Sequence, residues 1–304
     1  MKVSVVTTLY DSASYIAEFL QRIQAELKKL TSDYEILLVD DGSPDDSLRT
    51  ALGEMANEPN LKIIELSRNF GHHKAMMTGL EHAAGDLVFL IDVDLEEPPE
   101  LLTPFHEKLT REGLDVVYGY QETRKGGFGE RLLGGIAWKV FDLLLPIRLP
   151  SNHSTVRLMR RDYVQALVRH KESKTAIGGL WVITGFLQAG LAFRKGCRGS
   201  TSYSFRGRLF TLLDSITSFS EVPLFFVFNT GLVVLLVSAL IATALLVRRM
   251  TGHVMEGWVS ILLSVWFLGG LSIFSIGVVG LYVSRIFIET KNRPYTIVRK
   301  VHGA

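Results

Sequence analysis

The sequence holds a single cysteine, Cys197, and that scarcity excludes two kinds of small protein. One cysteine forms no internal disulfide framework and does not make up a cysteine zinc site. An excess of charge of one sign is also missing, because 33 lysines and arginines face 31 aspartates and glutamates, for a formal net charge of +2. A chain so close to neutral gives no global argument for nucleic-acid binding. We therefore expect no nucleic-acid partner.

Charge is absent from two long stretches, 222–247 and 258–284. Each exceeds the roughly 20 apolar residues that an α-helix needs to cross a bilayer. Buried core helices are the alternative, but two such runs in succession favour a two-helix transmembrane hairpin. A signal peptide is not expected either, because Met1 and Lys2 lead directly into the strand-like run VSVVTT.

Positive residues around these runs predict an orientation. The connecting loop 248–257 holds two arginines, whereas the opposite flanks hold ten lysines and arginines: Arg194, Lys195, Arg198, Arg206, Arg208, Arg285, Lys291, Arg293, Arg299 and Lys300. Such residues are enriched on the cytoplasmic side of a membrane. We expect the large N-terminal domain and a tail, 285–304, in the cytoplasm at the inner membrane. The segment 201–221 is predicted to be an interfacial amphipathic helix, with an ordinary surface helix as its alternative.

Residues 1–200 alternate two patterns. Short apolar runs rich in β-branched residues stand at 3–8, 35–40, 61–66, 87–92 and 115–118. The segments between them show helical periodicity, as in 15–30, where apolar residues recur every three or four positions. Strand–helix alternation predicts an α/β domain with a mainly parallel sheet covered by helices on both faces. Ligands bind such sheets at the carboxyl ends of the strands.

Three acidic residues follow the fourth apolar run at alternate positions: Asp92, Asp94 and Glu96. Carboxylates packed this closely repel one another unless a cation lies among them, and oxygen ligands suit Mg²⁺ or Mn²⁺. Such a metal would neutralise the charge that builds on a leaving nucleoside diphosphate. The alternative is a solvated acidic turn, because a D-x-D triplet alone arises by chance in many chains.

Two more polar segments follow the second and third runs. In VDDGSPDDS, a carboxylate such as Asp40 is able to accept hydrogen bonds from a base or ribose, and Gly42 permits a tight turn. In SRNFGHHKA, a turn is followed by the cationic candidates His72, His73 and Lys74. Adjacent histidines point in different directions on a helix, so we expect no histidine metal site there.

Together, TLYD, VDDGSPDDS, SRNFGHHKAMMTGL, GDLVFLIDVDLEEPPE and VRLMRRDYV resemble the family 2 inverting glycosyltransferases with a GT-A fold. More narrowly, the chain resembles the polyprenyl-phosphate sugar transferases, such as dolichyl-phosphate mannose synthase and its bacterial relatives. The resemblance covers nearly the whole chain, including the hairpin and the motif from Gly280 to Pro294. It implies a nucleotide-sugar donor, a polyprenyl phosphate acceptor (undecaprenyl phosphate in bacteria) and Mg²⁺ or Mn²⁺, in modification of a surface polysaccharide or lipid.

The resemblance also implies roles for single residues. The nucleotide-sugar would lie against Thr8, Tyr10, Asp40, Asp41, Lys74, Asp92 and Val93. The metal would be held by Asp92, Asp94 and Glu96, the last in place of the family's usual glutamine. The catalytic group would comprise Asp94, Arg131 and Arg157, of which Arg131 matches an arginine that helps to hold phosphate groups near the membrane surface.

The chain departs from the family pattern at five positions: Thr8 for a proline, Ser12 for a glutamate, Gln121 for an arginine, Ser202 for a lysine, and Thr155 for an aspartate proposed as catalytic base. The last departure bears on the acceptor. A phosphate monoester, with a second pKa of about 6, is largely a dianion at pH 7 and needs no base. A sugar hydroxyl does need one, unless His153 substitutes, so Thr155 favours a phosphate acceptor.

Two alternatives stay open at the level of sequence. One is transfer to a sugar or lipid hydroxyl, and the other is a catalytically inactive membrane binding protein. The sequence also leaves the sugar, the nucleotide and the oligomeric state open, a homo-oligomer included.

Overall fold

The computed structural model describes residues 1–121, 153–172, 177–194, 222–250 and 257–303. These residues fall into two compact units, one holding 1–121, 153–194 and 293–303 and the other holding 222–250 and 257–292. Arg131, Ser202 and the interfacial segment predicted at 201–221 lie outside the described residues.

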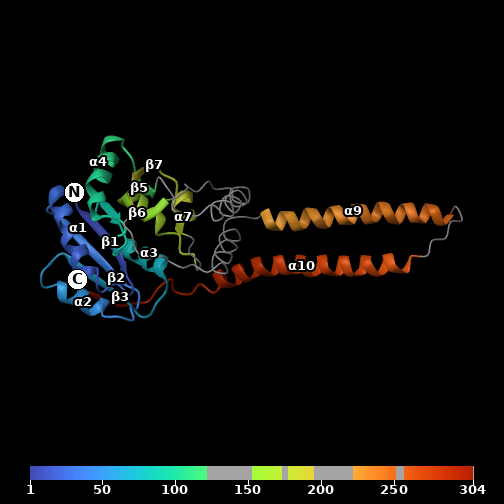
Figure 1. Ribbon diagram of the computed structural model, residues 1–304, viewed down its shortest axis with the longest axis horizontal. Coiled ribbons are helices and arrows are strands. Elements are labelled where there is room, and N and C mark those ends of the chain that lie inside the picture. The colour runs from blue at the N-terminus through green and yellow to red at the C-terminus, as the bar shows by residue number, and fades with distance from the viewer. Residues whose placement is uncertain (122–152, 173–176, 195–221, 251–256, 304) are drawn as a thin grey trace. The chain divides into compact units, whose positions relative to one another are not determined.

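The described strands of the first unit form one mixed sheet (Figure 1). In chain order they are β1 (Val3–Leu9), β2 (Tyr34–Asp40), β3 (Leu61–Leu66), β4 (Leu87–Leu90), β5 (Val116–Gln121), β6 (His153–Arg160), β7 (Gln188–Phe193) and β8 (Val298–His302). The spatial order is β7-β5-β6-β4-β1-β2-β3-β8. Strands β1 to β4 are parallel, as predicted, whereas β6 runs antiparallel to β4 and β5, and β8 antiparallel to β3.

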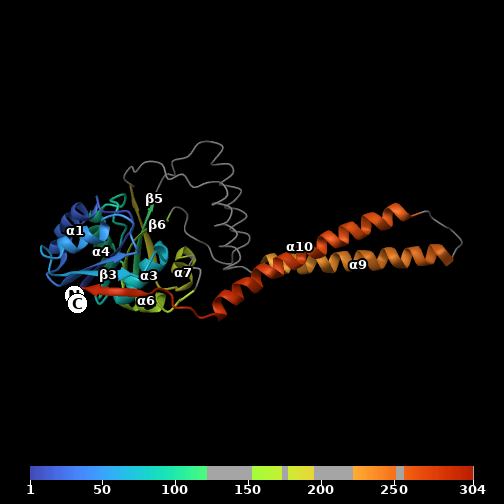
Figure 2. The same cartoon turned by 90° about the horizontal axis from the view of Figure 1, so that it is seen from below.

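Helices cover both faces of this sheet (Figure 2). They are α1 (Ile16–Leu30), α2 (Ser47–Glu54), α3 (His72–His82), η1 (Pro99–Leu101), α4 (Leu102–Arg111), α6 (Arg161–Leu167) and α7 (Ile177–Ile183). Because side chains alternate along a strand, Val5 of β1 packs in the core with Phe19 of α1 and Phe105 of α4. Its neighbour Val6 meets α3 instead, where a side chain larger than that of Gly79 would lie 2.5 Å from it. With helices on both faces of the sheet, every residue of β1 is buried.

The C-terminal tail adds a strand that the sequence did not predict. Residues 285–304 were predicted only as a cytoplasmic tail, and within them β8 pairs along the outer edge of β3, with Ile64 opposite Val301. The contact continues before the strand, where the Ser67 N–H donates to the carbonyl of Ile297 at 2.9 Å. The Thr78 and Thr296 hydroxyls are hydrogen bonded at 2.8 Å. Residues 293–303 are therefore part of the sheet domain, and they cover an otherwise open edge.

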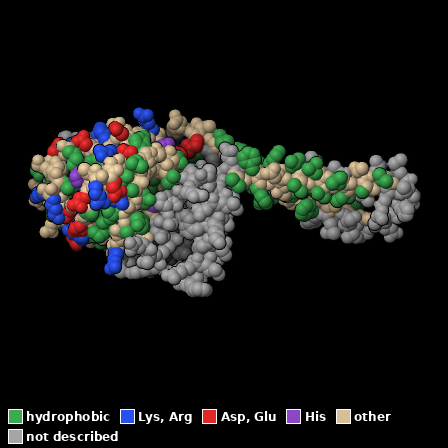
Figure 3. All heavy atoms as spheres, turned by 90° about the horizontal axis from the view of Figure 1, so that it is seen from above, with side chains coloured by type: hydrophobic (Ala, Val, Ile, Leu, Met, Phe, Trp, Pro, Cys, Tyr) green, Lys and Arg blue, Asp and Glu red, His purple; other side chains and the backbone are tan. Residues whose placement is uncertain are grey.

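The second unit consists of two long helices, α9 (Val222–Met250) and α10 (Trp258–Thr290), which contact each other. They extend beyond the predicted ends at 247 and 284. Apolar side chains such as Phe228 and Ile273 are exposed on them, and Figure 3 shows hydrophobic atoms along their length. Among the described residues, one helical segment, Phe267–Thr290, is long and apolar enough to cross a membrane. A transmembrane hairpin stays a prediction.

Candidate functional site

The carboxyl ends of β1, β2 and β4 bring together residues that are far apart in sequence. The parallel register places Leu9 beside Asp40 and Val6 beside Leu90. The backbone continues this alignment beyond the strands, because the Asp41 N–H donates to the carbonyl of Leu9 at 3.0 Å. The structure thus gathers the ends that carry Tyr10, Asp40 and Asp92 on one edge of the sheet, where α/β sheets bind ligands.

Asp92 is held there by a histidine. Oδ1 of Asp92 lies 3.3 Å from Nε2 of His72, the first residue of α3. The other ring nitrogen of His72, Nδ1, lies 2.9 Å from the Thr8 hydroxyl. Burial lowers the pKa of His72, but the bond to Asp92 and the charges of Asp92, Asp41 and Glu97 outweigh burial, so that the pKa is raised. In sequence, His72 was a candidate only as a cation or a metal ligand, and its place after the third strand was the one signal for this contact.

Asp41 positions the start of α3. Its two carboxylate oxygens accept hydrogen bonds from the backbone N–H groups of Phe70, at 2.7 Å, and Gly71, at 2.9 Å. The side chain is buried, and burial raises its pKa more than these bonds lower it. Asp40 is buried as well and accepts a bond from the Ser43 N–H at 3.3 Å. Both oxygens of Asp41 hold the loop that carries His72, and its contact with the nucleotide stays a prediction.

The turn after β4 bends sharply at Leu95, whose φ of 61° lies in the left-handed region. A non-glycine residue there costs roughly 1–2 kcal/mol. Oδ1 of Asp94 accepts the Glu96 N–H at 3.1 Å, which stabilises the bend, and Val93 is buried. In the described part of the chain, no three His, Cys, Asp or Glu side chains form a group that would hold a metal ion. Asp92, Asp94 and Glu96 therefore stay a predicted ligand set.

Strand β6 places Thr155 next to this turn. The antiparallel register pairs Leu90 with Arg157, so the residues before Arg157 run beside those after Leu90. The Ser154 hydroxyl donates to Oε1 of Glu97 in the turn. The position at which the family resemblance implied an acidic base thus lies on the same edge of the sheet as Asp92.

Arg157 was predicted to be catalytic, but its guanidinium does not face solvent. The residue is 2% exposed, and burial lowers its pKa to about 9 despite the nearby Tyr163 and Glu97. Its Nε and one terminal nitrogen donate to the carbonyls of Thr155, at 3.2 Å, and Ser154, at 3.4 Å. The contacts of Arg157 support the segment that precedes it. A direct role in transfer stays a prediction.

The remaining predicted residues are more peripheral. Tyr10 is half exposed at the end of β1. The Lys74 ammonium lies 5.2 Å from the ring centroid of Tyr295, in the C-terminal tail. The ring of His153 packs edge-on against Trp181, with centroids 5.7 Å apart.

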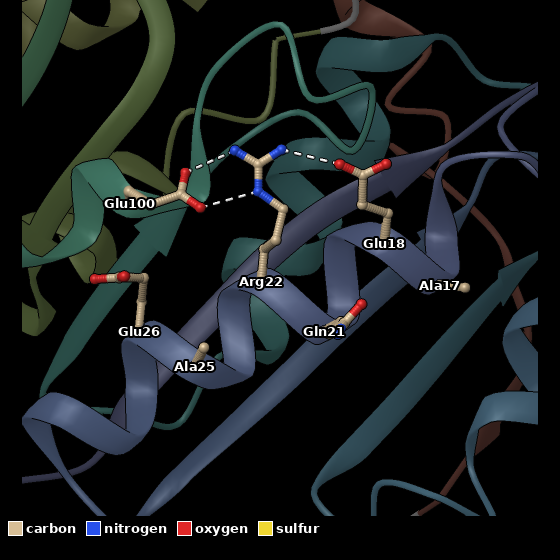
Figure 4. A pocket seen from close by; sticks show the side chains of 7 residues that line it. All are labelled: Ala17, Glu18, Gln21, Arg22, Ala25, Glu26 and Glu100. Atoms are coloured by element: carbon tan, nitrogen blue, oxygen red, sulfur yellow. Dashed lines mark hydrogen bonds and ion pairs between the residues drawn. The ribbon is translucent and has the colours of Figure 1, made fainter.

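A separate hollow of about 670 Å³ lies on the outer side of α1. Figure 4 shows Arg22 pointing between Glu18 and Glu100, with which it forms ion pairs at 3.1 and 2.7 Å. The positive charge in this hollow is thus paired with carboxylates, and none of the predicted site residues lines it. We do not assign the donor to this hollow.

Comparison with known proteins shows the family to which the chain belongs. Residues 4–168 match the family described as Glycosyl transferase family 2. The chain is 49% identical over 305 residues to a Mycobacterium tuberculosis protein that is named as a glycosyltransferase, with 100% of this chain and 89% of that protein covered. It is 31% identical over 308 residues to the bactoprenol glucosyl transferase of Shigella phage SfII, with 99% of each covered.

A solved structure shares the fold. The mannosyltransferase PcManGT from Pyrobaculum calidifontis, in complex with GDP-Man and Mn²⁺, superimposes with a TM-score of 0.51 and 17% identity over 95% of this chain and 86% of that one. Identity this low supports the fold alone, an α/β sheet of the GT-A type. The family match over more than half of the sequence and the 49% identical relative identify the chain as a member of the family 2 glycosyltransferases.

Proposed function

We propose that the protein transfers a sugar from a nucleotide-sugar to polyprenyl phosphate, with inversion at the anomeric carbon, on the cytoplasmic face of the membrane. The observation that carries the proposal is the position of Asp92, at the end of β4 beside the ends of β1 and β2. A nucleotide lying across these strand ends would place its diphosphate next to Asp92. The relative named a bactoprenol glucosyl transferase, alike over its full length, supports a polyprenyl phosphate acceptor.

The residues fit a divalent metal in this role. Asp92 and Asp94 offer hard oxygen ligands, and the Asp92 side chain is 27% exposed, so a cation is able to reach it. Mg²⁺ is usually held by one or two carboxylates together with substrate phosphates, which agrees with a site that holds no complete protein cage. When bound, Mg²⁺ or Mn²⁺ would neutralise the charge that builds on the leaving diphosphate.

The residue at position 155 supports a phosphate rather than a hydroxyl acceptor. Thr155 has no group that would remove a proton at neutral pH, whereas an acceptor phosphate is already ionised. The nearby carboxylate of Glu97 is 1% exposed and accepts the Ser154 hydroxyl, so it is not available to a substrate as a base. Catalysis would depend on positioning and on electrostatic stabilisation of the leaving group.

The helices of the second unit support a membrane location. The exposed apolar side chains on α9 and α10 would be costly in water and would lie against lipid. A polyprenyl chain stays in the bilayer, so an enzyme that uses its phosphate has to work at the membrane surface.

The test is transfer by membranes that contain the protein. Membranes would be incubated with undecaprenyl phosphate and a panel of labelled nucleotide-sugars, and the lipid would be extracted. We expect label in the lipid fraction with one donor and none with the Asp92→Asn variant. Label in a glycan or glycolipid hydroxyl would favour the alternative acceptor. If neither transfer nor donor hydrolysis occurs with any donor, the result would favour an inactive binding protein.

A further inference from the structure

We propose that His72 is a positioning residue. Its ring bridges the Thr8 hydroxyl and the Asp92 carboxylate, and this bridge fixes the orientation of the carboxylate. The three side chains come from three elements: Thr8 from β1, His72 from α3 and Asp92 from the turn after β4. The contacts run in sequence, with 2.9 Å from the Thr8 hydroxyl to Nδ1 and 3.3 Å from Nε2 to Oδ1 of Asp92. This inference depends on the proposed role of Asp92 at the donor.

The arrangement suits positioning because both ends are firmly placed. Thr8 is buried in a strand paired on both sides, next to Val39 in the register. His72 begins a helix whose preceding loop is held by the Asp41 carboxylate through the backbone N–H groups of Phe70 and Gly71. The imidazole ring therefore has little freedom, and its bond restricts the rotation of a carboxylate that would otherwise be mobile.

The Thr8 hydroxyl is a partner for Nδ1 of His72 in either protonation state of the ring. In a neutral imidazole that donates from Nε2 to the carboxylate, Nδ1 accepts from the Thr8 hydroxyl, and in the charged form Nδ1 donates to the hydroxyl oxygen. A partner on the second nitrogen fixes the ring and the tautomer, as it does for histidines at metal sites. Thr8 was predicted to line the nucleoside pocket, and here its hydroxyl acts through His72. The family's usual proline at this position has no hydroxyl to do so.

The partial exposure of His72 allows a second explanation of its role, which is direct contact with the donor. The side chain is 47% exposed, so it is also accessible to a substrate. If His72 contacted the donor directly, the Thr8 hydroxyl would contribute little, and the two residues would act independently. Coupling between Thr8 and His72 therefore separates the two explanations.

The test is a double-mutant cycle on the full chain in detergent, with Thr8→Val and His72→Phe singly and together. Thr8→Val removes the hydroxyl at nearly constant shape. We expect Thr8→Val to lower kcat/KM about 5- to 10-fold, the value of one hydrogen bond. His72→Phe should lower it about 10- to 100-fold, the range for partners of metal ligands. The double variant should be no worse than His72→Phe alone.

Rescue variants provide the matched controls. Thr8→Ser retains a hydroxyl and should recover most of the lost activity. His72→Gln retains an amide N–H for Asp92 and a carbonyl oxygen that is able to accept from the Thr8 hydroxyl, so it should recover part of the activity lost in His72→Phe. Additive losses in the cycle, or Thr8→Ser as impaired as Thr8→Val, would overturn the proposal.

Two further measurements do not depend on turnover. The Mn²⁺ concentration that half-saturates UDP or GDP binding, measured by calorimetry, should rise at least several-fold in His72→Phe. In ¹⁵N-histidine-labelled protein, Thr8→Val should shift the ring signals assigned to His72. Unchanged ring signals would overturn the proposed contact between Thr8 and His72, even if the enzyme transfers sugar as proposed. Shifted signals in a protein that transfers no sugar would retain the Thr8–His72 contact and refute only the proposed function.

Discussion

Arg157 lies under Trp181, with its guanidinium carbon 3.0 Å from the centroid of the indole ring. The buried cation is satisfied by this aromatic face and by carbonyls of its own strand, to which it donates. This contact fixes the segment that holds Ser154 and Thr155 beside the turn with Asp92. Position 155 is therefore held next to the candidate donor site, although it has no acidic group.

Thr155→Ala should retain at least about a tenth of wild-type activity, because an ionised phosphate acceptor requires no general base. Steady-state transfer to undecaprenyl phosphate measures this. A companion variant, His153→Gln, tests whether the nearby imidazole replaces the missing base. A loss of about a thousand-fold in either variant, which is within the range for a lost general base, would contradict the phosphate-acceptor model.

Asp94→Asn should lower turnover by about two orders of magnitude or more while the fold stays intact, because a metal ligand loses its charge. Turnover would be titrated with Mg²⁺ and Mn²⁺, and the fold followed by circular dichroism. Asp86→Asn, in the loop before β4, gives a control for the substitution itself. Full activity of Asp94→Asn, or of the wild type in a chelator, would refute the metal role.

Gly42→Ala and Gly113→Ala should differ in stability although their backbones are alike, with φ of 64° and 62°. In Gly113→Ala the new methyl group meets nothing within 4 Å, so we expect only the left-handed backbone cost of about 1–2 kcal/mol. In Gly42→Ala it would lie 2.7 Å from the backbone carbon of Arg68 and from the Asn69 nitrogen. Denaturant unfolding should therefore show a larger loss for Gly42→Ala.

The same pair has a functional consequence. The backbone that Gly42→Ala would displace belongs to the loop that leads to His72, so nucleotide binding should weaken in that variant. Gly113→Ala should bind nucleotide normally. Equal effects of the two substitutions on stability and on binding would show that the close approach of Gly42 to the loop is not important.

Glu35 should contribute to stability at neutral pH and lose that contribution in acid. Burial raises the pKa of Glu35, but hydrogen bonds from Ser4, the Ala84 N–H and Lys2 outweigh it, so that the folded-state pKa is lowered. The ionised form is thus favoured in the folded protein. The stabilisation is present above the unfolded pKa of about 4.3 and is lost as the pH falls through the folded value.

Glu35→Gln should therefore cost about 1–3 kcal/mol at pH 7, the value of bonds to a buried charged group. The difference from the wild type should shrink as the pH falls below about 4. Urea unfolding between pH 3 and pH 7 measures both, with Glu107→Gln, at an exposed position on α4, as the control. A difference that is independent of pH would contradict the assignment.

The sequence by itself located the first five strands and the first helix of the catalytic domain. Short apolar runs rich in β-branched residues located β1, β2 and β3, and helical periodicity located α1, because burial on one or both faces dictates which residues are apolar. Polar residues at the strand ends indicated the edge where the site lies. The motifs around Asp40 and Asp92 were specific enough for the family, which the comparisons confirm.

Only the tertiary structure decided which residues distant in sequence contact one another. The contact between Thr8 and Asp92 through His72 joins residues 64 and 20 positions apart, and only strand order brings them together. Arg157 reads as a catalytic cation in a motif, but packing buries it under Trp181. Strand β8 was missed because its short, charged sequence becomes a strand only when the exposed edge of β3 offers it hydrogen-bonding partners. Local sequence sets which segments fold, whereas the partners of each side chain depend on distant segments that only the assembled sheet places beside it.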